Sequence, residues 1–93
     1  MGNEEFMKAC KHIVAQYFNE HKDKTDTFVL SENDVYVVWL CKALGNNKAL
    51  LSTIVPDNKY YEITYNGEKC EFYLDIYVKL VNECIHREDV NNG

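Results

Sequence analysis

Glu62 and Glu71 are the two side chains whose types and spacing most directly suggest chemistry. They flank Asn66-Gly67, a dipeptide that tolerates positive φ at both positions and therefore predicts a two-residue hairpin turn. In that register Glu62 lies directly opposite Glu71, and like charges in opposed positions repel. Such a pair could bind a cation or act as an acid and a base, with Asp75 close by. The alternative is a solvated outer sheet face, with Lys69 in the neighbouring pair.

The histidines and cysteines lack the spacing of a metal or catalytic site. Cys10/His12 and Cys84/His86 are each two residues apart, and on a helix such residues diverge by about 200°. No C-x-x-C pair, nucleophile motif, glycine-rich phosphate loop or dinucleotide-binding fingerprint is present. His12 and His21 have no carboxylate partner at a fixed spacing, which is typical of surface histidines. We therefore expect no catalytic residue, no metal site and no cofactor, and a protein that is not an enzyme.

The four cysteines are predicted to be reduced residues of the core. A disulfide framework in a short chain requires a secretory context, and residues 1–5 lack the basic and apolar regions of a signal peptide. Each cysteine also falls on the apolar phase of its segment, where a thiol packs as a small hydrophobic group. These features predict a cytoplasmic protein with four unpaired thiols: Cys10, Cys41, Cys70 and Cys84.

Aromatic residues are numerous for so short a chain. Neighbours on a strand, such as Tyr60 and Tyr61, point to opposite faces, so some rings must face outward. Exposed tyrosine beside acidic residues is typical of protein interfaces, because it gives a large contact area at a low entropy cost. Equally, the rings could fill a small core and cover its rim. The residues concerned are Tyr36, Tyr60, Tyr61, Tyr65, Tyr73, Tyr77 and Trp39.

The composition fits one soluble domain. Ninety-three residues leave no room for two domains, and a hydrophobic fraction of 46% is too high for a disordered chain. The longest apolar run, 35–41, is strand-sized, so no membrane span is expected. The net charge is −5 and only one basic residue, Arg87, is arginine, which argues against direct nucleic-acid binding. The same modest charge also makes the chain a weak mimic of a phosphate backbone.

The first third of the chain predicts a helix over 3–20 followed by a loop over 21–33. The helix carries a continuous apolar stripe, and Asn3 is expected to cap its N-terminus. The loop is polar except for a short apolar island, 27–30, which is expected to plug into the core or to form a short edge strand. The stripe residues are Phe6, Cys10, Ile13, Val14, Tyr17 and Phe18.

Strands are predicted over 35–44 and 48–55, joined by a turn at Gly45-Asn46-Asn47. Both runs are apolar on both phases, more than a half-exposed sheet requires. One sheet face must therefore meet the helices. The other must be covered by the 21–33 segment, by a second subunit or by a partner.

The last third predicts strands over 59–65 and 68–72, a helix over 73–86 and a frayed tail over 88–93. Residues 70–78 alternate as a strand does, yet the apolar residues from Tyr73 to Cys84 also follow helical spacing. A helix is expected from 73 because a run from 68 to 85 is long for one strand. The expected fold is α+β, in the order α-β-β-β-β-α, with an antiparallel meander and both helices available to cover one face.

Several stretches together resemble a family of small uncharacterised proteins of phages, prophages and mobile elements of Gram-positive bacteria. The resemblance implies an accessory protein acting in the cytoplasm of a bacterial host. Small acidic phage proteins of this kind often bind and block a host protein, including immune enzymes. The stretches are Asn3–Lys8, Asp34–Trp39, Asn46–Thr53, Tyr60–Gly67 and Tyr73–Asp75.

The leading hypothesis is a phage-encoded module that binds and inhibits or redirects a host protein, with an anti-defence role as one form of that activity. Its predicted contact residues are Tyr60, Glu62, Lys69, Glu71 and Tyr73. One alternative is a homodimer that sequesters a small molecule or nucleotide, for which Lys42, Lys48 and Lys59 could supply positive charge. Another is a self-assembling structural protein, because two strands that are apolar on both faces favour association.

Overall fold

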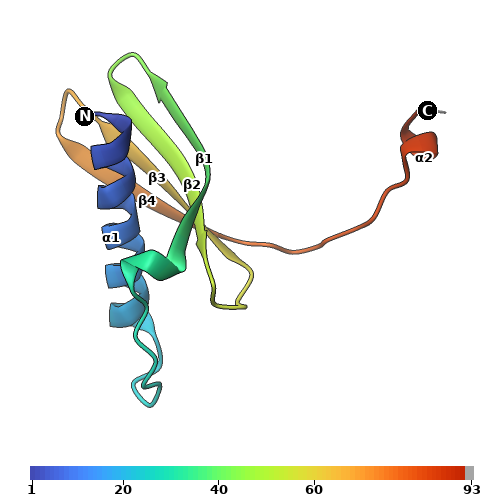
Figure 1. Cartoon of the computed structure of the whole chain (residues 1–93), viewed down its shortest axis with the longest axis horizontal. Coiled ribbons are helices and arrows are strands. Elements are labelled where there is room, and N and C mark those ends of the chain that lie inside the picture. The colour runs from blue at the N-terminus through green and yellow to red at the C-terminus, as the bar shows by residue number, and fades with distance from the viewer. Residues whose placement is uncertain (92–93) are drawn as a thin grey trace.

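A computed structural model describes residues 1–91 and shows one helix packed on a four-stranded sheet (Figure 1). The sheet is antiparallel throughout, in the order β1-β2-β3-β4. The predicted α+β class is confirmed. The elements are α1 (Asn3–His21), the 3-10 turn η1 (Glu32–Asp34), β1 (Val35–Ala43), β2 (Asn46–Thr53), β3 (Lys59–Asn66), β4 (Glu71–Val78) and α2 (Arg87–Asn91).

The core lies between α1 and one face of the sheet. The apolar stripe of α1 supplies Phe6, Cys10 and Val14, all fully buried, and β2 and β3 supply residues such as Leu51 and Ile63. The predicted helix is confirmed to within one residue at its end. Its cap is different, since Gly2 is the N-cap residue and no side-chain cap hydrogen bond forms.

The segment between α1 and β1 is a loop that plugs the core from the helix side. Leu30 is only 2% exposed and belongs to the core cluster. Asn19 of α1 holds it through two hydrogen bonds: the side-chain amide donates to the Leu30 carbonyl at 2.9 Å and its oxygen accepts the Leu30 N–H at 2.8 Å. Phe28 packs edge-on against Phe18 of α1, with ring centroids 6.2 Å apart. The plug interpretation is confirmed, and because the segment packs on α1 it leaves the far face of the sheet uncovered.

A β-bulge interrupts the alternation of β1, whose residues are apolar on both faces. Val37 pairs with Leu51 and Trp39 pairs with Leu50, so Val38 is an extra residue without a partner of its own. The bulge changes the phase of the alternation within the strand. The hairpin turn is also shifted from the predicted position. Leu44 and Gly45 form it, with positive φ of 54° and 81°, and Asn46 already begins β2.

The turn between β3 and β4 is longer than the predicted two residues. It spans 67–70, with Cys70 at φ 54°, and the Asn66 side-chain oxygen accepts two backbone N–H groups at 3.1 Å each. Asn66 therefore pairs with Glu71, and Glu62 pairs with Asp75 rather than with Glu71. This register stabilises the hairpin better, because it opposes apolar residues across the inner face: Tyr65 with Phe72, Ile63 with Leu74 and Tyr61 with Ile76.

The predicted strand 68–72 and helix 73–86 are wrong. Residues 71–78 form β4, 79–86 have no regular structure, and α2 begins at Arg87 instead of ending near it. Phe72, Leu74 and Ile76 alternate along β4 and join the core side of the sheet, so pairing with β3 overrides the helical spacing. As a result, α1 is the only helix within residues 1–91 that covers a sheet face. Of the predicted frayed tail 88–93, residues 88–91 lie in α2 and 92–93 lie outside the described residues.

The cysteines are unpaired, as predicted, but only Cys10 belongs to the core. Burial raises the pKa of the Cys10 thiol to about 12. The other three are exposed: Cys41 lies on β1, Cys70 in the turn before β4, and Cys84 in the segment after it. Apolar neighbours in the sequence therefore did not show which cysteines are buried and which are exposed. Across residues 1–91, no helix is both long enough and apolar enough to span a membrane.

The plug predicts a sharp contrast between two neighbouring residues. Replacing Leu30 with Ala should lower the free energy of unfolding by about 2–4 kcal/mol, because it leaves a cavity in the core. Replacing the exposed Val29 with Ala should change it by less than about 0.5 kcal/mol. Urea denaturation followed by tryptophan fluorescence measures both. Equal small effects would show that the loop is not part of the core.

Thiol labelling should separate the cysteines into two classes. With a disulfide reagent near pH 8, Cys41, Cys70 and Cys84 should react rapidly, whereas Cys10 should react only at the rate of unfolding. Mass spectrometry of labelled peptides assigns each site. Rapid modification of Cys10 in the folded protein would contradict the placement of α1 on the sheet.

Candidate functional site

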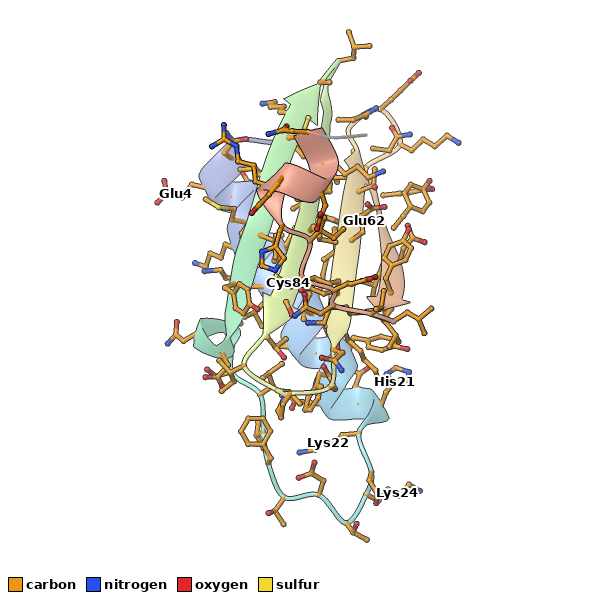
Figure 2. All side chains as sticks on the ribbon, turned by 90° about the vertical axis from the view of Figure 1, so that its right-hand side faces the viewer. Glu4, His21, Lys22, Lys24, Glu62 and Cys84 are labelled. Carbon is orange, nitrogen blue, oxygen red and sulfur yellow. The ribbon has the colours of Figure 1, made fainter. Side chains whose placement is uncertain are left out.

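The face of the sheet opposite α1 is the main candidate site, and we call it the open face. Strand alternation and the pairing register assign its members, since core residues alternate with them along the strands. At the bulge, Trp39 is assigned by its pairing with Leu50, and Val38 is exposed beside it. No described element covers it, and Figure 2 views the molecule from this side, with Glu62 labelled on the sheet. Its main residues are Tyr36, Val38, Trp39, Leu50, Tyr60, Tyr73 and Tyr77, together with the charged Lys48, Glu62, Glu71 and Asp75.

Aromatic rings dominate the open face. Tyr36 and Trp39 of β1 and Tyr73 and Tyr77 of β4 are all exposed, and Tyr60 lies directly opposite Tyr77. The remaining strand tyrosines, such as Tyr61, point into the helix side, where burial raises the pKa of the Tyr61 hydroxyl. The tyrosines therefore divide between the two faces: some fill the core and others are exposed. Rings that are already fixed by a strand provide contact area with little further loss of entropy.

The charged residues sit among these rings. Glu62 opposes Asp75 across the hairpin, and the Lys48 ammonium lies 3.4 Å from the Glu62 carboxylate. The Glu62 side chain is 19% exposed, so the lysine compensates a partly desolvated charge. Asp75 has no ion pair within residues 1–91. The Tyr73 hydroxyl donates to Glu71, and this hydrogen bond raises the pKa of Tyr73.

The structure brings together four of the five predicted contact residues. Tyr60, Glu62, Glu71 and Tyr73 share the open face, although Glu71 is not opposite Glu62, as predicted. Lys69 lies in the 67–70 turn, off the face. No cluster of three or more potential metal ligands occurs in the described part of the chain, so Glu62, Asp75 and Glu71 do not converge on a cation site.

Three exposed aromatic residues of the same face are absent from the predicted contact residues: Tyr36, Trp39 and Tyr77. The bulge at Val38 concealed the outward direction of Trp39, and the incorrect helix assignment removed Tyr77 from the sheet. The available signal was the unbroken alternation of 70–78, which places Tyr73 and Tyr77 on one face.

Elsewhere the structure offers less to a ligand. His12 has a carboxylate neighbour after all, Glu32, at 3.7 Å, but both side chains are exposed. The three lysines expected to suit an anionic ligand do not converge. Lys48 lies on the open face, whereas the Lys42 ammonium donates to the Met1 carbonyl on the helix side at 3.0 Å. Lys59 begins β3 at the other end of the sheet, beside Tyr17 and Tyr61.

The opposed carboxylates generate a test by charge removal. Replacing Asp75 with Asn should raise the free energy of unfolding by about 0.2–0.5 kcal/mol, because it removes the charge that faces Glu62. The gain should disappear at about 1 M salt, which screens the repulsion. The control is Glu83→Gln, which removes the same charge from an exposed position outside the sheet. Destabilisation by Asp75→Asn would instead show that the carboxylate has a favourable partner.

Comparison with known proteins places this fold in a family without assigning its activity. No curated protein matches the sequence, and no solved structure matches it. A family model described as a family of unknown function matches residues 7–87, which include most of α1 and all four strands. Since the match spans most of the chain, the protein belongs to the DUF6275 family.

Proposed function

We propose that the protein is a binding module that attaches its open face to a host protein and inhibits or redirects it. The observation that supports this most strongly is the uncovered, ring-rich face of the sheet. The 21–33 segment, one of three ways to cover that face, packs on α1 instead. The two other possible covers for the open face are a second subunit and a partner protein.

The chemistry of the open face defines the partner it fits. Tyr36, Trp39, Tyr73 and Tyr77 would be the apolar anchors, since tyrosine and tryptophan are enriched at binding hot spots. Glu62, Glu71 and Asp75 outnumber Lys48. The complementary surface is therefore an apolar patch bordered by lysine or arginine side chains.

The resemblance to proteins of phages and mobile elements supports a bacterial host protein as that partner. Three of the stretches that carry the resemblance, within 34–39, 46–53 and 60–67, form much of β1, β2 and β3. A net charge of −5 favours a basic target, and an enzyme of host defence is one class that fits. The proposal assigns no catalysis to this protein. Nucleotide sequestration has less support, because Lys42 and Lys48 lie on opposite faces of the sheet.

Affinity capture with matched surface variants tests the proposal. The full-length protein, immobilised by a C-terminal tag, is exposed to a Gram-positive lysate, and bound proteins are quantified by mass spectrometry. A specific partner should be lost with Trp39→Ser/Tyr73→Ser on the open face. It should be retained with Val29→Ser/Ile54→Ser, which removes two exposed apolar residues elsewhere.

The captured partner is then purified and titrated against both variants by calorimetry. Two lost anchors should weaken binding by about 100-fold or more. Equal binding by both variants would show that the open face is not the contact surface.

A further inference from the structure

The C-terminal arm, which we define as residues 79–91, leaves the sheet without packing on it. Every residue of the arm is exposed, including Leu80 at 97% and Ile85 at 65%. Figure 1 shows the arm running away from the sheet on the side opposite α1. Figure 2, seen from that side, shows Cys84 and α2 in front of the sheet. A segment with this many exposed apolar side chains favours burial against another surface.

The apolar residues of the arm are spaced as the stripe of an amphipathic helix. Leu80, Val81, Cys84 and Ile85 fall on one side of a helical projection, and the polar residues of 79–87 fall on the other. A helix this short is marginal in water on its own. Its formation therefore depends on a surface against which the stripe can pack, and without one residues 79–86 have no regular structure.

The open face has the chemistry that this stripe requires. Exposed aromatic rings lie across it, from Tyr36 and Trp39 on β1 to Tyr77 on β4. The charges beside the stripe are also complementary. Three carboxylates of the face stand against one lysine, whereas residues 79–87, which contain the stripe, carry two cations, Lys79 and Arg87, and one carboxylate. The other two carboxylates of the arm, Glu88 and Asp89, follow after the stripe.

The connection after β4 favours a second molecule over the arm's own sheet. Strand pairing continues through Lys79, whose N–H donates to the Asn58 carbonyl at 2.7 Å, and the stripe begins at the next residue. Residues 76–81 contain no Gly, Pro, Asn, Asp or Ser, the residues that favour a tight reversal of the chain. An extended arm reaches a neighbouring molecule without such a turn.

We infer that the arm of one chain folds as an amphipathic helix on the open face of a second copy. Reciprocal exchange of two arms gives a two-fold symmetric dimer in which each contact is made twice. This goes beyond the proposed function, because it describes the protein in the absence of its partner. A partner that binds the open face has to displace the arm.

Sedimentation velocity and circular dichroism of the purified full-length chain test the inference. The wild-type chain should be a dimer at micromolar concentration. Leu80→Asp/Ile85→Asp should raise the dimer dissociation constant by roughly 100-fold, since both apolar side chains leave the interface. The same variant should lose helical signal. Val90→Asp adds one negative charge on the other side of the arm helix and should remain a dimer.

The alternatives give different results. A dimer that the double variant does not weaken overturns the inference. A monomeric wild-type chain also overturns it, and helical signal that is lost in the double variant would then show the arm packed on its own sheet. Both variants change residues that are exposed in the single chain, so neither should unfold it. Because no host protein is present, these outcomes are independent of whether the capture experiment finds a partner.

Discussion

The packing of α1 on one face of the sheet is the contact on which the rest of the structure depends. Phe6, Cys10 and Val14 lose all exposure against Leu51, Ile63 and their neighbours, and this single layer is the whole core. A sheet has two faces and one helix covers only one of them. The uncovered face and the unpacked arm both follow from the absence of a second layer within residues 1–91.

That one-sided architecture separates two groups of aromatic residues with different tasks. Rings on the helix side, such as Tyr61 and Tyr65, complete a small core and fix the register of β3 and β4. Rings on the open face, such as Trp39 and Tyr77, leave apolar surface in water. The same alternation of the strands thus produces both stability and a surface that favours a partner.

Local pattern in the sequence was sufficient for α1, the α+β class and the sharing of one face by Tyr60, Glu62, Glu71 and Tyr73. The face assignment survived an incorrect hairpin register, because the partner of Glu62 moved by an even number of residues, from Glu71 to Asp75. An odd shift would have exchanged the two faces. For the site, it matters more that the register shift is even than that the turn length is predicted correctly.

The bulge at Val38 and the fate of residues 73–86 could not be predicted in the same way, because both depend on partners distant in sequence. Tyr73, Tyr77 and Cys84 satisfy helical spacing and strand alternation at once, and pairing with β3 decides between them up to Val78. After Val78, no described strand or helix packs on the chain to favour one conformation over the other. The ambiguity in the sequence corresponds to a segment that can adopt either conformation, depending on what it contacts.

Hydroxyl-radical footprinting tests most directly whether the open face is an interface. Oxidation of Trp39, Tyr73 and Tyr77 is compared between the dilute purified chain and the same chain inside living bacteria, with exposed Phe28 on the helix side as the internal reference. An interface predicts that the three open-face rings are protected in cells while Phe28 is oxidised equally in both. Equal oxidation of all four rings in both settings would contradict it.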